Sequence, residues 1–335
     1  RRVTGKGVHL VMTDSGWYRH RYFTRRGYRT NPVALGPGTS DPEVDANGHG
    51  TGESANALAV APDAEFTMVK LNFVNPTASF NAAVALSPDI ISNSWGWSTN
   101  GPLSAIQQAM AAAVATAVAN GVVVVFSAGN GGFGFPGQHP DVISAGGVYM
   151  GPDGALRATE YASGFASQVY AGRKVPDVSG LVGDPPRAAY LMLPIPSGCE
   201  IDVDLGGTPH PAGDGTTDTD GWAAFSGTSA AAPQVAGACA LIRQVCPGLA
   251  PAKVRRILRQ TARDVTAGTN AMGEVAGPGY DLATGSGLVN ANKAALRAKL
   301  QRLSDAAEAQ DDPDALSAQD ADELARLLAV ADGSD

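Results

Sequence analysis

The sequence predicts an α/β protein built on a doubly wound, mostly parallel sheet with helices on both faces. Five short apolar runs, at residues 7–12, 66–71, 90–93, 122–126 and 142–145, have the length and composition of buried strands. Helical periodicity fills the stretches between several of these runs, and such alternation is typical of this fold class. With 44% hydrophobic and 17% charged residues over 335 positions, the chain can bury a sizeable core.

Composition excludes several classes of function. The chain has 24 basic and 32 acidic residues, and its net charge of −8 disfavours contact with a phosphate backbone. Aromatic residues make up only 6% of the chain, which leaves few platforms for stacked bases. No apolar run approaches the roughly 18 residues of a bilayer span. We expect a monomer with no nucleic-acid partner and no membrane segment.

The first predicted strand ends in Thr13-Asp14-Ser15-Gly16, so Asp14 stands at the carboxyl end of a strand. Ligands bind at that edge of an open α/β sheet, where a buried carboxylate could orient a histidine. Taken alone, an aspartate that simply forms a turn is the commoner interpretation.

The second motif, Asn47-Gly48-His49-Gly50-Thr51-Gly52, precedes an alanine-rich helix. Glycine on each side keeps the imidazole of His49 accessible. A histidine with the ordinary pKa of about 6.5 suits proton exchange near neutral pH. A plain turn histidine explains this motif equally well when it is considered alone.

The strand at residues 122–126 leads into Ser127-Ala128-Gly129-Asn130, so Asn130 leaves the sheet at the same edge as Asp14. A side-chain amide N–H in that crevice can stabilise an oxyanion, although an Asn-Gly turn is the simpler interpretation.

A helix is predicted before this strand, and it ends near residues 120–121. The prediction comes from apolar residues spaced three and four apart, namely Leu103, Ile106, Met110, Val114 and Val118.

The densest motif is the string SGTSAAAP, which places Ser229 at the start of a helix predicted over residues 229–245. Unpaired N–H groups and the helix dipole favour negative charge beside its hydroxyl. A serine that only caps the helix is the commoner case. A further helix over residues 251–261 opens with a proline in its first turn.

Two segments fall outside the alternation. Residues 183–221 are rich in proline, glycine and aspartate and predict a surface insertion in a domain of residues 1–293. Residues 294–335 predict an acidic, alanine- and leucine-rich helical appendix. Five aspartates in the insertion offer oxygen atoms that could bind structural calcium, namely Asp202, Asp204, Asp214, Asp218 and Asp220. Because their spacing matches no complete calcium loop, we interpret these side chains as solvated.

The three cysteines, Cys199, Cys239 and Cys246, allow at most one disulfide. On one straight helix, Cys239 and Cys246 would lie about 10 Å apart, which is too far for a bond. Cys199 would therefore have to be one partner in any bridge.

Together the four strings TDSG, GHGTG, SAGN and SGTSAAAP resemble the subtilisin-like serine proteases, the subtilase family, over residues 1–293. The resemblance implies that Ser229 is the nucleophile, His49 the general base and then acid, Asp14 the orienting carboxylate and Asn130 an oxyanion donor. The implied function is endopeptidase hydrolysis through an acyl-enzyme on Ser229, with no cofactor required for the chemistry.

The resemblance also implies a polypeptide-binding groove. Ser94, Trp95 and Gly96 would pair with the substrate backbone as an added strand. Ser127, Ala128 and Gly129 would form the other wall of the primary pocket, with Gly134 near its base. Since no carboxylate is expected there, we predict a preference for an apolar or aromatic residue before the scissile bond.

Two features of the sequence around His49 differ from the family pattern. Gly52 stands where relatives often carry histidine. The helix after His49 lacks the looped insertion that holds calcium in many relatives, so no metal site is expected there.

Two other functions remain open from the sequence. The chain could be a noncatalytic peptide-binding scaffold, or a ligase that resolves the acyl-enzyme with an amine. Because relatives are commonly exported with an N-terminal segment that is later removed, and the chain starts at Arg1, we expect a secreted protein with a pro-segment outside this chain. A cytoplasmic location is not excluded by the sequence.

Overall fold

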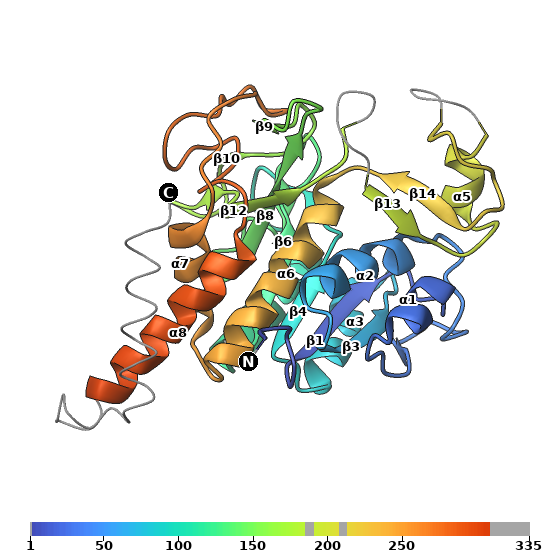
Figure 1. Cartoon of the computed structure of the whole chain (residues 1–335), viewed down its shortest axis with the longest axis horizontal. Helices are drawn as coiled ribbons and strands as arrows, with labels where there is room; N and C mark the ends of the chain where they lie inside the picture. The colour runs from blue at the N-terminus through green and yellow to red at the C-terminus, as the bar shows by residue number, and fades with distance from the viewer. Residues whose placement is uncertain (1, 185–190, 208–212, 309–335) are drawn as a thin grey trace.

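The computed structural model describes residues 2–184, 191–207 and 213–308, and it confirms the doubly wound, mostly parallel sheet (Figure 1). The sheet has eight strands, and those in the path β12-β8-β6-β4-β1-β3-β2 run parallel to their neighbours. β9 (Leu156–Ala158) is antiparallel to β8 at the side. The parallel strands are β1 His9–Asp14, β2 Ala34–Leu35, β3 Glu65–Lys70, β4 Ile90–Asn93, β6 Val123–Ser127, β8 Ile143–Met150 and β12 Val178–Leu181.

Helices cover both faces of this sheet. On the face toward the viewer in Figure 1, α2 (His49–Val60), α6 (Thr228–Val245) and α8 (Ala291–Glu308) lie side by side. Alternate residues of β1 therefore enter two different cores: Leu10 and Met12 pack with the α2 and α6 residues, whereas Val11 packs with Phe80 of α3 and Met110 of α4. The remaining helices are α1 Arg21–Arg26, α3 Pro76–Ala85, α4 Ala105–Ala119, α5 Glu200–Leu205 and α7 Pro251–Thr261.

Some elements differ from the prediction in their bounds. β8 continues to Met150, beyond the predicted end at residue 145, and β12 was not predicted. Ser179 and Gly180 interrupt the apolar pattern of β12, which hides it in the sequence. Three small antiparallel pairs lie outside the main sheet, namely β5 (Trp97–Ser98) with β7 (Gly134–Phe135), β10 (Phe165–Ala166) with β11 (Lys174–Val175), and β13 (Leu191–Pro194) with β14 (Trp222–Phe225).

The described part of residues 183–221 contains β13 and α5. Leu193 and Ile195 are buried in the core that α2 and α6 share, so part of this segment packs inside the protein. Three of its five aspartates accept hydrogen bonds from the backbone: Asp202 from Gly198 N at 2.7 Å, Asp214 from Ala224 N at 2.9 Å, and Asp220 from Trp222 N at 3.0 Å. Among the described residues, no group of three or more histidine, cysteine or acidic side chains could hold a metal ion.

All three cysteines, Cys199, Cys239 and Cys246, are buried and free, and none is joined in a disulfide. The predicted appendix begins within α8, where Ala294, Ala298 and Leu303 are buried, and residues 309–335 lie outside the described part of the chain. No helix in the described ranges is both long and apolar enough to cross a bilayer.

Candidate active site

The carboxyl end of β1 meets the start of α2, and this junction brings Asp14 and His49 together. Asp14 is 2% exposed, and its Oδ1 lies 2.7 Å from His49 Nδ1. The close approach depends on glycine, because a Cβ on Gly50 would lie 2.3 Å from the carbonyl oxygen of Gly16. Gly48 precedes the helix at φ 94°, a conformation that side chains with a Cβ rarely adopt.

Asp45 stabilises the same junction and was not identified from the sequence. Its side chain is 2% exposed and accepts hydrogen bonds from Thr51 N at 2.9 Å, Gly48 N at 3.0 Å and Ser15 Oγ at 2.8 Å. The carboxylate thus satisfies free N–H groups at the positive end of α2. An aspartate just before a predicted helix start was the available signal.

Ser229 lies in the first turn of α6 and exchanges two hydrogen bonds with Ser94. Pro233, four residues later, has no N–H to donate to the carbonyl of Ser229. Ser94 Oγ donates to that carbonyl oxygen instead, at 2.9 Å. In return, Ser229 Oγ donates to the carbonyl oxygen of Ser94 at 3.3 Å. The end of β4 therefore holds the start of α6 in place.

Asn130 is oriented by the residue next to Ser229. Its Oδ1 accepts hydrogen bonds from Thr228 N at 2.9 Å and from Thr228 Oγ1 at 3.0 Å. Since both contacts use the oxygen, the amide nitrogen of Asn130 is the group left to donate. A Cβ on Gly227 would lie only 3.2 Å from that nitrogen, so the glycine keeps space beside it.

Ser94, Asn130 and Ser229 line a common cavity of about 250 Å³. The predicted residues that line it are Ser94, Trp95, Gly96, Ser127, Gly129, Gly134, Asn130 and Ser229. Ala128 does not line it: this residue is fully buried, and its carbonyl oxygen would lie 2.1 Å from a Cβ on Gly134. No aspartate or glutamate among the described residues lines this cavity. The residues that sequence analysis missed there are Trp97, Ser98, Gly132, Phe135 and Thr228.

A second cavity, of about 490 Å³, lies beside Asp14 and His49. It shares Ser94 and Trp95 with the first cavity, so the two form neighbouring parts of one surface. No hydrogen bond joins His49 Nε2 to Ser229 Oγ within the part of the chain that the structure describes. Hydrogen bonds between catalytic groups are often long in unliganded enzymes and shorten when a substrate binds.

The carboxylates around His49 favour its protonated form. Burial acts to lower the pKa of the imidazole, but 26% of the side chain is exposed, so this effect is partial. The charge and hydrogen bond of Asp14, followed by the charges of Glu53 and Asp45, raise the pKa to about 9. The imidazole is therefore a stronger base than an isolated histidine.

Glu53 is the most unexpected group near this site. It lies one helical turn after His49 on α2, and its side chain is fully buried. Oε2 accepts a hydrogen bond from Asn56 Nδ2 at 2.8 Å, whereas Oε1 has no hydrogen-bond partner and lies 4.0 Å from His49 Nε2. Burial raises the pKa of this carboxyl to about 7. The spacing of four residues was visible in the sequence, but the burial was not.

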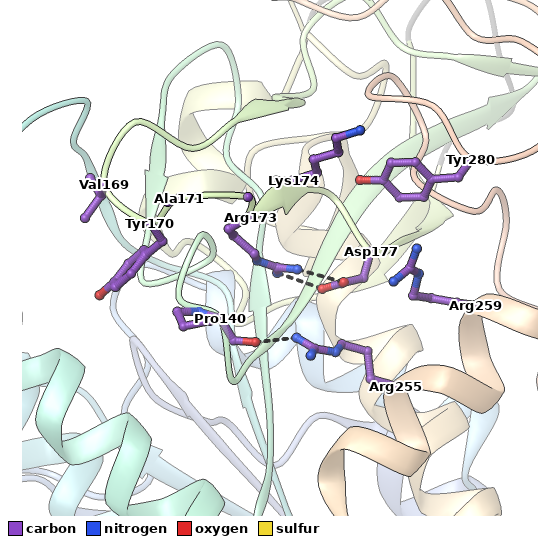
Figure 2. A pocket seen from close by; sticks show the side chains of 11 residues that line it. Pro140, Val169, Tyr170, Ala171, Arg173, Lys174, Asp177, Arg255, Arg259 and Tyr280 are labelled. Atoms are coloured by element: carbon purple, nitrogen blue, oxygen red, sulfur yellow. Dashed lines mark hydrogen bonds and ion pairs between the residues drawn. The ribbon is translucent and has the colours of Figure 1, made fainter.

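A third cavity, of about 710 Å³, lies away from all of these residues, between α7 and the segment that contains β11 (Figure 2). Figure 2 shows Arg173 paired with Asp177 through two hydrogen bonds, at 2.7 and 2.8 Å. Arg255 donates to the carbonyl oxygen of Pro140, and the guanidinium of Arg259 lies 5.0 Å from the ring centre of Tyr280. None of the predicted site residues lines this cavity.

Comparison with known proteins identifies relatives over most of the chain. The sequence profile described as "Subtilase family" matches residues 5–287. Alkaline elastase YaB of Bacillus sp. (strain YaB) is 27% identical over 316 residues, which cover 88% of this chain and 66% of that protein. Subtilisin Savinase of Lederbergia lenta is 27% identical over 312 residues, which cover 88% of this chain and 93% of that protein.

Solved structures show the same fold. Sphericase has a TM-score of 0.61 and 24% identity, with coverage of 86% of this chain and 92% of that one. A structure titled as a lanthipeptide protease has a TM-score of 0.62 and 21% identity, with coverage of 87% of this chain and 88% of that one. The arrangement of β1, β4, β6 and α6 around the two cavities is thus part of a fold with known examples.

Proposed function

This chain belongs to the subtilase family of serine peptidases, and we propose that it is an endopeptidase that cleaves peptide bonds through an acyl-enzyme on Ser229. One observation carries the proposal. Ser229 and Asn130 line one cavity, and Ser94 and Trp95 connect it to the cavity that contains the imidazole of His49. Subtilases need no cofactor for catalysis.

In the proposed mechanism, Ser229 Oγ attacks the carbonyl carbon of the substrate while His49 Nε2 takes the hydroxyl proton. Asp14 holds the other ring nitrogen at 2.7 Å and stabilises the positive charge that forms on the imidazole. The hydrogen bond of Ser229 Oγ to Ser94 is long, at 3.3 Å, so little is lost when the hydroxyl turns toward His49. His49 then protonates the leaving amine, and water hydrolyses the ester.

Two donors are positioned to stabilise the oxyanion. The Oδ1 of Asn130 is occupied by Thr228, which leaves the amide N–H groups free to donate. Ser229 N belongs to the first turn of α6, where N–H groups have no partner within the helix. Donors of this kind act most strongly when they are already in place before negative charge develops.

The substrate is proposed to be a polypeptide that binds as an extended strand along Ser94, Trp95 and Gly96. The residue before the scissile bond would enter the cavity between this segment and Ser127–Gly129, above Gly134. The absence of an acidic side chain from that cavity, together with the aromatic rings of Trp97 and Phe135 in its wall, supports a preference for apolar or aromatic residues.

A fluorophosphonate probe tests the nucleophile. We expect the probe to label the protein and to form no adduct with Ser229→Ala, because only an activated hydroxyl reacts at a useful rate. A folded protein that binds peptides but takes no label would instead be a peptide-binding scaffold. Product masses with an added amine distinguish hydrolysis from ligation, since a ligase would yield the amide.

A peptide library tests the specificity. Cleavage should follow apolar and aromatic residues, and strict cleavage after arginine or lysine would overturn the proposed pocket.

We also propose that the protein is a monomer that is exported after removal of a pro-segment. Light scattering would test the oligomeric state, and the N-terminal sequence of protein from the culture medium would test the export and the processing. Structural calcium remains a proposal that the effect of a chelator on the melting temperature would test.

A further inference from the structure

The starting point is a buried acidic group that the proposed mechanism does not use. Glu53 lies on the same face of α2 as His49, four residues later, where helical side chains are neighbours. Its side chain has no exposed surface, and one carboxyl oxygen is left without a hydrogen bond. A buried, unpaired carboxyl oxygen is costly, so its position needs an explanation.

The geometry directs that oxygen at the imidazole. Asn56 Nδ2 anchors Oε2 at 2.8 Å, and this contact points Oε1 toward His49 Nε2, 4.0 Å away. The separation is that of an ion pair and not of a hydrogen bond. Asp14 occupies Nδ1 on the opposite side of the ring. The imidazole therefore lies between two buried carboxyl groups.

Aromatic packing covers one side of this arrangement. Phe225 of β14 is 5% exposed, and its ring centre lies 6.1 Å from that of His49. The ring fits against the first turn of α2 because residue 52 is glycine: a Cβ there would lie 2.7 Å from Phe225 Cζ. Charges interact more strongly when water is excluded, so Gly52 and Phe225 strengthen the coupling of Glu53 to His49.

We propose that Glu53 is a positioning residue for His49: its buried carboxylate lies on the Nε2 side of the imidazole, stabilises the imidazolium and thereby confines the free base to alkaline pH. This inference rests on the function proposed above, in which His49 accepts the proton of Ser229. When Glu53 is ionised, its negative charge stabilises the imidazolium, which cannot accept a proton from serine. The base becomes available only when the imidazolium loses its proton.

The other ionisable groups around the pair do not cancel this effect. Asp14 from β1 and Asp45 from the loop before α2 are both acidic, and both favour a protonated His49. Glu200 of α5 is a third acid, and it lines the same cavity as His49. The charges that shift the pKa of His49 come from Asp14, Glu53 and Asp45, and those that act on Glu53 come from His49 and Asp14.

Tyr161 is a further ionisable group that interacts with Glu53. Tyr161 follows β9, and burial raises the pKa of its hydroxyl, with the charges of Asp184 and Glu53 acting in the same direction. The phenol therefore stays neutral while Glu53 titrates. α6, which packs along α2, carries Arg243 in its last turn, but the guanidinium of Arg243 donates to the carbonyl oxygen of Gly121. Within the described ranges, the ion pair of Glu53 is therefore the one with His49, at 4.0 Å.

The experiment compares Glu53→Gln and Glu53→Met with the wild type. Both variants remove the charge, but only glutamine retains an acceptor for Asn56. The control is Glu65→Gln, an exposed acid at the start of β3, at the opposite edge of the sheet. The first measurement is an NMR titration of the His49 imidazole in the Ser229→Ala background, which requires no turnover.

In both Glu53 variants, we expect the imidazole to lose its proton at a pH lower than in the wild type by about one unit or more, because a stabilising negative charge is gone. The second measurement is kcat/KM against pH. Its acid limb should move to lower pH by the same amount, so that the value at pH 7, relative to the alkaline plateau, rises about tenfold or more. Glu65→Gln should leave both curves unchanged.

The outcomes separate this inference from the proposed function. An unchanged imidazole titration in a folded Glu53→Gln protein would overturn the role of Glu53, whether or not the enzyme turns over. A shift in Glu53→Met without one in Glu53→Gln would also overturn it, since the effect would then belong to the contact with Asn56. A shifted titration in a protein that cleaves no peptide would support the role of Glu53 and reject the peptidase function.

Discussion

Replacement of Gly180 tests how the sheet positions the proposed nucleophile. Gly180 lies in β12 against the first turns of α6, the helix that carries Ser229. A Cβ at position 180 would lie 2.7 Å from the Cα of Ala231 and 3.0 Å from its carbonyl oxygen. Carbon atoms in contact are about 3.5–4.0 Å apart, so Gly180→Ala requires the two backbones to separate by about 1 Å. Both obstacles are helix backbone atoms, so no change of rotamer removes them.

The expected loss of activity exceeds the expected loss of stability. Overpacking by one methyl group costs about 1–3 kcal/mol, which a domain with a stability of about 5–15 kcal/mol survives. A displacement of about 1 Å at a reacting group can lower the rate about 100-fold. We therefore expect Gly180→Ala to remain folded and to lose about two orders of magnitude in kcat/KM, because Ser229 no longer meets His49 and Asn130 correctly.

Two assays and one control make the prediction testable. Cleavage of a fluorogenic peptide measures kcat/KM, and urea unfolding in the Ser229→Ala background measures stability without self-digestion. Gly101→Ala is the control, because a Cβ there has no atom within 4 Å. If Gly180→Ala folds and cleaves peptides at the wild-type rate, then contact between β12 and α6 does not position the nucleophile, and our account of the site is wrong.

Three further changes test other contacts. In Tyr161→Phe, the Gly227 N–H loses its acceptor at 2.8 Å, and urea unfolding should show a loss of about 1–3 kcal/mol from the unpaired group. Asn130→Ala should lower kcat with little change in KM, by about 10²- to 10³-fold, the loss known for the oxyanion asparagine of subtilisin itself. Melting temperatures should fall as the pH rises from 4.5 to about 9, because the raised pKa values of Glu53 and His49 make the folded state retain protons that the unfolded state has released. The fall should be smaller in Glu53→Gln, measured with Ser229→Ala, and an equal fall would contradict this explanation.

The sequence alone identified the groups proposed to form the site. Asp14, His49, Asn130 and Ser229 each follow a strand end or begin a helix, and such positions can be recognised from a few neighbouring residues. Because the carboxyl ends of parallel strands meet at one edge of a sheet, four local motifs sufficed to predict a common location. The doubly wound sheet was predictable for the same reason, since buried strands produce continuous apolar runs.

Only the tertiary structure decided how these groups contact one another. The exchange of hydrogen bonds between Ser94 and Ser229 joins residues 135 positions apart, and no local pattern indicates it. Glu53 looks from the sequence like an ordinary helical glutamate, and it becomes a buried neighbour of His49 only in the folded protein, where Phe225 packs against that turn of α2. Burial and charge coupling arise from segments that are distant in the chain, so the ionisation of the site is a property of the folded protein.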